Sequence, residues 1–189
     1  MVPPRRPGQT LTQDDWIAAA YRRFAEGGLD AVRVEALARD LGVSKGSFYW
    51  HFRDRAALLT AFLARWEAVS LALIRGAGEQ PTPRARLRHV LTQIFAGGTA
   101  VVGSEISFLA WSRHDPQAAR VAARVEEQRL AFLAGQLQAG GLPPERAWAQ
   151  AELLYAALLG YLDRLARQAT DLSPGAFLLL LTALLPEDA

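Results

Sequence analysis

The sequence predicts an all-α protein of about nine helices, in which a three-helix head is joined by a fourth helix to a larger helical body. Apolar residues recur at helical spacing along most of the 189 residues. No run alternates cleanly with period two, and no Asn-Gly or Asp-Gly hairpin signal occurs. Signals for helix starts, such as Thr82-Pro83 and Asp115-Pro116, alternate with paired glycines that end helices.

The composition narrows the class of protein. Hydrophobic residues make up 51% of the chain, which excludes a disordered chain, and the absence of cysteine excludes disulfides and thiolate chemistry. A cysteine-free chain fits a reducing cytoplasm. The first ten residues lack the apolar run of a secretory signal, and the most apolar stretch, 177–185, is too short to span a bilayer. We therefore expect a cytoplasmic protein with no membrane partner.

The signals for helix starts and ends divide the chain into a head, residues 1–55, and a body, residues 56–189. Thr12 and Asp15 form a capping-box pattern at the start of the first helix, and Gly27-Gly28 is expected to end that helix. The excess of basic over acidic residues, nine against seven, lies entirely in the head and hints at a nucleic-acid surface. The helices are expected at about 13–26, 34–41, 45–52, 55–76, 83–96, 103–114, 116–139, 144–168 and 174–185.

Three short helices with a tight Gly42-Val43 turn before the third are the layout of a helix-turn-helix. The third helix, capped by Ser44, carries the aromatic run 48–52. Phe48 and Phe52 are four residues apart, so they share a face and can pack on the first two helices. The run wraps the whole circumference of a helix, so Tyr49 or Trp50 should reach the surface.

The stretch from Gly28 to Leu59 resembles the DNA-binding head of the tetracycline-repressor (TetR) family. The matching run is VEALARDLGVSKGSFYWHF at 34–52, followed by Asp54, Arg55 and Leu58-Leu59. The resemblance implies a helix-turn-helix that binds double-stranded DNA at a palindromic operator. It also implies a helical body that binds a small-molecule effector and dimerises through its last two helices.

The resemblance assigns DNA contacts by position. Lys45 and Ser47 stand where bases or phosphates are contacted, Tyr49 and His51 where phosphates are held, and Arg55 where a basic phosphate contact begins the fourth helix. Arg33 stands where the family usually offers a capping Ser or Thr, so the cap of the second helix is in doubt. The DNA-contact candidates are Arg33, Ser44, Lys45, Gly46, Ser47, Tyr49, Trp50, His51 and Arg55.

Plainer interpretations stay open for this head. Lys45 and His51 can be solvated surface residues, and Tyr49 and Trp50 can belong to the core. The pair Arg5-Arg6 can be a minor-groove arm or a charged tail.

The last two predicted helices carry the dimer hypothesis. An apolar stripe runs along the eighth helix, and the last helix is apolar on nearly all sides, so it needs neighbours all around. Pairing with a second copy supplies them, although the same residues can instead form the core of one chain. The dimer candidates are Leu154, Leu158, Tyr161, Leu162, Leu165, Phe177 and Leu181.

Aromatic residues on the body helices are candidates for a ligand pocket, with ordinary core packing as the alternative. A mostly apolar wall predicts a hydrophobic or amphipathic ligand. The ligand candidates are Trp66, Phe95, Glu105, Phe108, Trp111, Phe132 and Tyr155, with Ser107, Arg113, His114 and Gln128 as further polar possibilities.

The chain shows no signature of catalysis. The three histidines lack metal-ligand spacing, and no nucleophile elbow or phosphate-binding glycine loop occurs. We expect no enzyme, no cofactor and no metal. The favoured hypothesis is a transcriptional repressor that a small, mostly apolar ligand releases from its operator. The alternative is a regulator or scaffold whose body binds a protein partner and takes no small-molecule effector.

Overall fold

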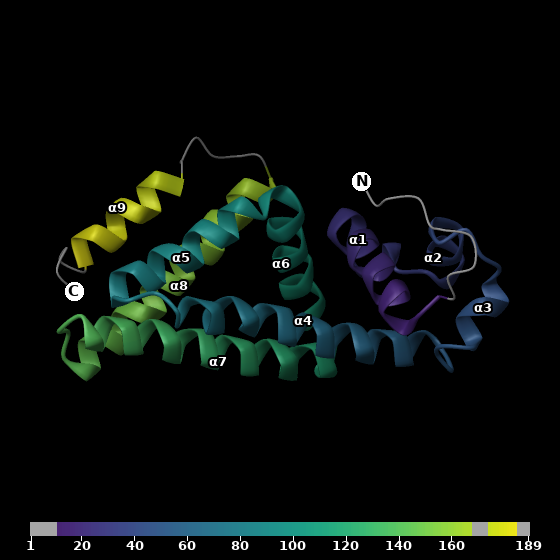
Figure 1. The fold of residues 1–189 in the computed structure, drawn as a ribbon, viewed down its shortest axis with the longest axis horizontal. Helices are drawn as coiled ribbons and strands as arrows, with labels where there is room; N and C mark the ends of the chain where they lie inside the picture. The colour runs from purple at the N-terminus through teal and green to yellow at the C-terminus, as the bar shows by residue number, and fades with distance from the viewer. Residues whose placement is uncertain (1–10, 168–173, 185–189) are drawn as a thin grey trace.

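The computed structural model describes residues 11–167 and 174–184, and this part of the chain is helical with no strand (Figure 1). The all-α fold class is therefore confirmed. In chain order the helices are α1 (Gln13–Ala31), α2 (Val34–Asp40), α3 (Lys45–Tyr49), α4 (Arg55–Ala77), α5 (Pro83–Ala96), α6 (Gly98–Ser112), α7 (Pro116–Ala139), α8 (Pro144–Ala166) and α9 (Pro174–Leu184).

Helix α1 begins as the sequence predicts. The Thr12 hydroxyl accepts from the backbone N–H of Asp15 at 3.3 Å, and the Asp15 carboxylate accepts from the Thr12 N–H at 2.8 Å, which completes the capping box. The regular helix is interrupted at Gly27-Gly28, as predicted, because both glycines have non-helical backbone angles, and a further helical segment continues to Ala31 after this kink. Gly28 has a φ of +62°, a conformation that glycine adopts without strain.

Two helix boundaries differ from the sequence prediction. Helix α3 ends at Tyr49 rather than near Phe52, so it is only five residues long. Helix α6 begins at Gly98 rather than near residue 103, because Gly98, with a φ of +62°, makes the turn from α5 almost alone.

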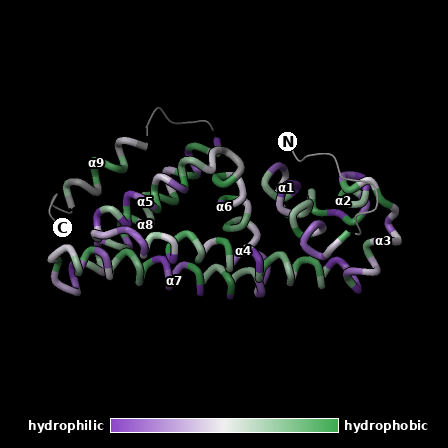
Figure 2. Tube along the Cα trace, in the orientation of Figure 1, coloured by the Kyte–Doolittle hydropathy of each residue, from purple (hydrophilic) through white to green (hydrophobic). Residues whose placement is uncertain are grey.

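Helix α4 links the head to the body. The Asp54 carboxylate caps it by accepting from the Ala57 N–H at 2.8 Å, and the helix then runs beside α7 along the molecule (Figure 1). Among the described residues, α4 is the one single helix long and apolar enough to cross a membrane. Its residues Leu58, Phe62 and Trp66 are buried within the protein. Figure 2 shows the mixture of hydrophobic and hydrophilic segments along α4 and α7.

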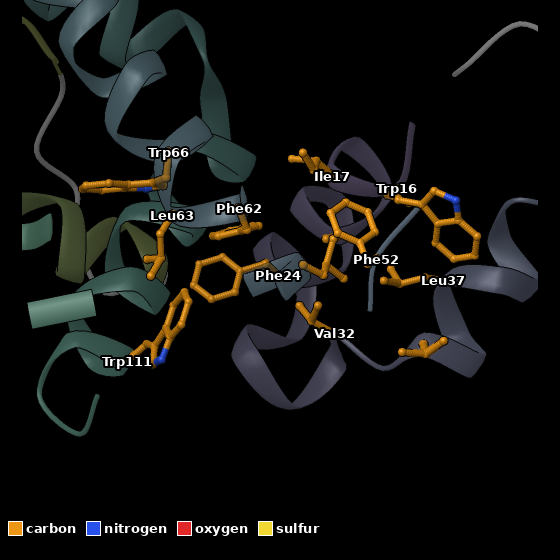
Figure 3. Packing of buried hydrophobic residues seen from close by; sticks show 14 of the residues in the cluster. Trp16, Ile17, Phe24, Val32, Leu37, Phe52, Phe62, Leu63, Trp66 and Trp111 are labelled. Atoms are coloured by element: carbon orange, nitrogen blue, oxygen red, sulfur yellow. The ribbon is translucent and has the colours of Figure 1, made fainter. Parts of the chain in front are cut away.

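One hydrophobic core passes from the head into the body without a break. Trp16 and Leu37 lie at its head end, Phe24 and Phe62 lie in the middle, and Trp111 lies at the body end (Figure 3). A second core lies farther along the body between α5, α7 and α8. The head is therefore packed onto the body rather than tethered to it.

Helices α1 and α6 meet at very short range. A Cβ atom at Gly103 would lie 3.0 Å from the Ala25 carbonyl oxygen of α1, so a side chain there would force one of the two helices to shift. Helix α6 therefore packs directly against the backbone of the first head helix.

Candidate DNA interface and ligand cavity

The aromatic run of α3 and its flank divides between core and surface. Phe48 and Phe52 are buried, whereas Tyr49 is 56% exposed and Trp50 is 89% exposed. The prediction that Tyr49 or Trp50 reaches the surface is confirmed, and both residues do so. Both side chains are therefore available for contact with another molecule.

The buried face of α3 packs against α1, and this packing fixes the position of the exposed face. Trp16 of α1 packs edge-on against Phe48 at 5.3 Å between ring centroids, and Phe48 stacks on Phe52 at 5.6 Å. The Gln13 side-chain amide donates to the carbonyl of His51 at 2.8 Å. A short helix that is poorly stable alone is thereby fixed by its aromatic anchors.

Lys45 is exposed but paired. Its ammonium group donates to the carboxylate of Glu35 on α2, which raises the pKa of Lys45 and lowers the pKa of Glu35. Both side chains are more than half exposed, so the pair is weak and a phosphate can replace the carboxylate. Lys45 is thus a cation held at the surface next to Tyr49 and Trp50.

The structure revises the two arginines expected at the DNA. The Arg55 guanidinium donates to the carbonyls of Val32 at 2.8 Å and Leu29 at 2.9 Å, so it ties the start of α4 to the end of α1. Arg33 is exposed, and it donates to the Asp30 carbonyl at 2.9 Å. Arg55 therefore has a structural role inside the head, which sequence reasoning did not predict.

The caps of the head helices also depart from expectation. Ser44 precedes α3, but its side chain makes no capping hydrogen bond, so the predicted cap is wrong in this structure. Arg33 precedes α2 without a side-chain cap, as the departure from the family pattern suggested. The Ser44 hydroxyl and Gly46 are exposed, and Ser47 and His51 are half-buried. Arg5 and Arg6 lie outside the described residues.

A bidentate ion pair connects helices α1 and α2. Arg23 donates to both carboxylate oxygens of Asp40 at 2.6 Å. The hydrogen bond from Arg23 holds the pKa of Asp40 below its ordinary value. This pair fixes α2, against which α3 turns.

The body contains a cavity of about 590 Å³. Its wall is overwhelmingly apolar and is contributed by α1, α4, α5, α6, α7, α8 and α9. The volume is in the range of small-molecule sites. Because α1 belongs to the head and α4 starts there, a molecule in the cavity touches elements that carry the helix-turn-helix.

Three polar residues, Arg129, Glu105 and Tyr155, lie together in this apolar wall. The Arg129 guanidinium donates through both terminal nitrogens to the Glu105 carboxylate, and Nη1 also donates to the Tyr155 hydroxyl at 3.3 Å. Its Cζ lies 5.7 Å from the centre of the Trp66 ring. Burial acts to lower the pKa of Arg129, but the charge and hydrogen bonds of Glu105 raise it above the ordinary value, so Arg129 remains charged. Burial raises the pKa of Tyr155, against the opposing effect of Arg129, so the hydroxyl keeps its proton.

Four of the seven ligand candidates line the cavity: Trp66, Glu105, Phe132 and Tyr155. The other three do not. Phe108 is fully buried behind Trp66, on which it stacks at 3.5 Å, and Trp111 packs on Phe24 and Phe62 in the core. Phe95 packs edge-on against Tyr161 at 5.6 Å. The further polar possibilities, Ser107, Arg113, His114 and Gln128, are absent from the wall as well.

Sequence reasoning missed Arg129 and Tyr21, which also line the cavity. A charged residue on a helix normally faces solvent, so Arg129 gives no signal until Glu105 is known to lie beside it. Tyr21 stacks on Phe62 of α4 at 4.4 Å between ring centroids, a partner that lies far away along the chain. Only tertiary structure identifies these two residues.

The predicted dimer stripe is largely used inside one chain. Leu154, Tyr161 and Leu162 are buried in the monomer, because α8 turns this face toward α5 and α7, so they cannot form a surface for a second copy. Leu158, Leu162 and Phe177 line the cavity. Leu165 is half-buried, and the side chain of Leu181 lies outside the described residues. Elsewhere on α8, Trp148 is 45% exposed and Leu153 is 71% exposed, and α9 exposes Leu179 and Leu180.

A helix-turn-helix with an exposed third helix, mounted on a helical body with a cavity, is an arrangement that suits a DNA-binding transcription regulator. Comparison with known proteins then gives the family. Residues 17–62 match the family "Bacterial regulatory proteins, tetR family", which confirms the resemblance seen in the sequence. Residues 17–62 are therefore similar to the DNA-binding head of TetR-family regulators.

Relatives and solved structures agree with this assignment. The chain is 30% identical over 86 residues to the HTH-type transcriptional regulator TtgR of Pseudomonas putida. That match covers 44% of this chain and only 41% of the relative.

The fold extends over nearly the whole chain. A transcriptional regulator from Rhodococcus sp. Rha1 superposes with a TM-score of 0.77 at 20% identity, over 92% of this chain and 94% of the other. A regulator from Saccharomonospora viridis, solved in complex with choline, gives a TM-score of 0.78 at 17% identity, over 90% and 93% of the two chains. At these identities the likeness shows the fold.

Proposed function

We propose that the protein is a dimeric repressor that binds a palindromic operator and is released from it by a small, mostly apolar ligand. The observation that carries this proposal is a firmly packed head with an exposed α3, joined through α1 and α4 to a body with a cavity of about 590 Å³. The residues 1–55 form the DNA-binding part, and 56–189 form the effector-binding and dimerising part.

The DNA-contacting surface is centred on the exposed residues of α3 and its flanks. Lys45 exchanges its Glu35 partner for a phosphate or a base edge, Tyr49 donates its hydroxyl to a phosphate, and Trp50 packs against the sugar-phosphate backbone. Ser44, Gly46, Ser47 and His51 complete the surface. Arg33 reaches a phosphate from the start of α2, and Arg55 positions the head without touching DNA.

The dimer places two copies of α3 at half-sites one DNA turn apart. The exposed apolar residues Trp148 and Leu153 on α8, together with Leu179 and Leu180 on α9, are the surface that a second copy would cover. This surface replaces the buried stripe that the sequence suggested. The protein acts in the cytoplasm, where its DNA lies.

Release by a ligand requires that the ligand prefer one arrangement of the heads. The cavity supports this, because its wall includes α1 of the head and α6, which touches α1 at Gly103. The Saccharomonospora viridis regulator was solved in complex with choline, so a protein of this fold can bind a small molecule. The alternative, a body that binds only a protein partner, is disfavoured by a cavity of this volume. No catalytic role is proposed.

Fluorescence anisotropy on the DNA upstream of the gene, titrated at two salt concentrations, tests the proposal. Saturable binding that weakens with salt and survives excess random DNA is expected. Binding no tighter than to random DNA would argue against this operator, and selection from a random library then decides whether another exists. A compound that binds the body and leaves the DNA affinity unchanged is not an effector.

A further inference from the structure

The ion pair between Glu105 and Arg129 in the cavity wall is electrically neutral as a whole. Glu105 and Arg129 are both largely enclosed, with side chains 13% and 18% exposed, and each carboxylate oxygen accepts from a different guanidinium nitrogen. The two formal charges cancel at contact distance. Apart from this pair, the charged residue in the lining is Arg22, which is exposed to solvent.

Apart from Arg22, whose side chain is exposed to solvent, a charged ligand therefore meets no free counter-charge in the described part of the cavity wall. Moving an ion out of water into an apolar site is costly unless a partner compensates for the lost hydration. An anion would have to displace Glu105 from Arg129, and a cation would have to displace Arg129 from Glu105. An uncharged molecule has neither cost.

Two tyrosine hydroxyls in the wall keep hydrogen-bonding capacity: that of Tyr21, which is buried without a partner in the part of the chain that the structure describes, and that of Tyr155, which lies at the Glu105–Arg129 pair. The Tyr155 hydroxyl oxygen accepts from Arg129, and among the described residues its proton is donated to no acceptor. A ligand oxygen placed against it completes the network. Around this point the wall is apolar, with Phe132, Leu158 and Leu162 among its residues.

We propose that the cavity selects uncharged hydrophobic molecules with a carbonyl or hydroxyl oxygen at one end, which accepts a hydrogen bond from Tyr155. Glu105 determines this selectivity by neutralising Arg129. The ligand class rests on the proposed function only for its regulatory meaning, since the binding preference stands on the cavity alone.

Isothermal titration calorimetry on the full chain tests the preference with three probes of matched chain length: 2-decanone, decanoate and decyltrimethylammonium, each below its aggregation concentration. We expect 2-decanone to bind at least about tenfold more tightly than either ion. Equal or tighter binding of decanoate or decyltrimethylammonium would overturn the proposal.

Two variants assign the roles of the residues. Glu105→Gln keeps an acceptor for Arg129 but removes the neutralising charge, so decanoate should become the tightest of the three probes. Tyr155→Phe keeps the ring and removes the donor, so 2-decanone should bind about 3- to 10-fold more weakly. The binding of decyltrimethylammonium should not change.

Tyr161→Phe is the matched control, because it makes the same change on the same helix at a residue outside the cavity wall. It should leave all three affinities unchanged. Unaltered 2-decanone binding in Tyr155→Phe, or an unaltered order of probes in a folded Glu105→Gln, contradicts the proposal. If Glu105→Gln fails to fold, the order of probes in the natural protein and the Tyr155→Phe result decide the matter.

Operator anisotropy on the same samples separates the two proposals. Binding of 2-decanone without release of DNA would refute the effector role and leave the ligand class intact. Release of DNA by a charged probe, with no binding of 2-decanone, would refute the ligand class and leave the effector role intact.

Discussion

The head and the body contain similar apolar residues but pack them differently. In the head, Trp16, Phe24 and Phe48 are completely buried and pack ring against ring. In the body, leucines and aromatics of the same kind surround about 590 Å³ of space. Empty volume costs stability, because the residues around it lose packing partners. A filled interior suits a surface of fixed shape, and a hollow one suits a site that another molecule completes.

The ion pairs of the two regions differ in the same way. Arg23–Asp40 and Lys45–Glu35 in the head lie at the surface, where water can replace either partner. Glu105–Arg129 in the body is enclosed, and removing one partner leaves a charge without water or counter-ion. The ion pairs of the head can therefore exchange partners with solvent or another molecule, whereas the enclosed pair of the body is satisfied within the chain.

The largest expected effect is on the packing of the head. Phe48→Ala removes a fully buried ring and should lower the free energy of unfolding by about 3–5 kcal/mol, as measured by urea denaturation. Tyr49→Ala, next to it and exposed, should change stability by less than about 0.5 kcal/mol and weaken DNA binding. Similar losses of stability in the two variants would contradict the description of the head.

Lys45→Ala should weaken operator binding by about 1–3 kcal/mol if Lys45 reads a base. If it holds only a phosphate, anisotropy should show the same loss on every sequence and a smaller salt dependence. Arg146→Ala, an exposed cation at the start of α8, is the control and should have no effect. Operator affinity that is the same in Lys45→Ala as in the natural protein would remove Lys45 from the interface.

Filling the cavity should increase stability, in contrast to the loss expected from Phe48→Ala. Leu158→Phe adds volume to the wall and should raise the free energy of unfolding by about 0.5–2 kcal/mol, while reducing the affinity for 2-decanone. Ala123→Leu, which enlarges an exposed residue of α7 outside the cavity wall and the proposed dimer surface, should do neither. A loss of stability in Leu158→Phe would mean that the wall is already too tightly packed to accept the larger ring.

The smallest effect is expected at the surface pair of the head. Asp40→Asn should lower stability at pH 7 by about 0.2–1 kcal/mol. Because Arg23 lowers the pKa of Asp40, this contribution is present above the unfolded-state pKa of about 3.9 and is lost as pH falls through the folded-state pKa. Urea midpoints of Asp40→Asn and the natural protein should therefore converge in acid. Glu152→Gln on α8 serves as an exposed carboxylate control, and midpoints that stay equally far apart at low pH would contradict the assignment.

Local signals in the sequence predicted the head well because its determinants are close together in the chain. The Thr12–Asp15 capping box, the Asp54 cap and the division of the aromatic run each depend on residues within four positions of one another. The structural role of Arg55 was not predicted, because its hydrogen-bond partners, the Leu29 and Val32 carbonyls, lie more than twenty residues away.

The body was harder to predict for the same reason. An apolar stripe on α8 shows that one face is buried, but not whether α5 and α7 or a second chain covers it. Leu154 and Tyr161 were assigned to a dimer, yet they lie inside one chain. Trp111 and Phe108 were assigned to the pocket, although periodicity does not distinguish the lining of a cavity from the core behind it.

The contact at Gly103 has a mechanical consequence. Side chains between two helices act as a compliant layer, since rotamer changes can absorb a small displacement before it reaches the next backbone. Between α6 and α1 there is no such layer at this point, because the Ala25 carbonyl faces a residue without a side chain. Helix α6 also borders the cavity through Val102 and Glu105. Displacement of α6 toward α1 is therefore passed to the head as a rigid push, with little lost on the way.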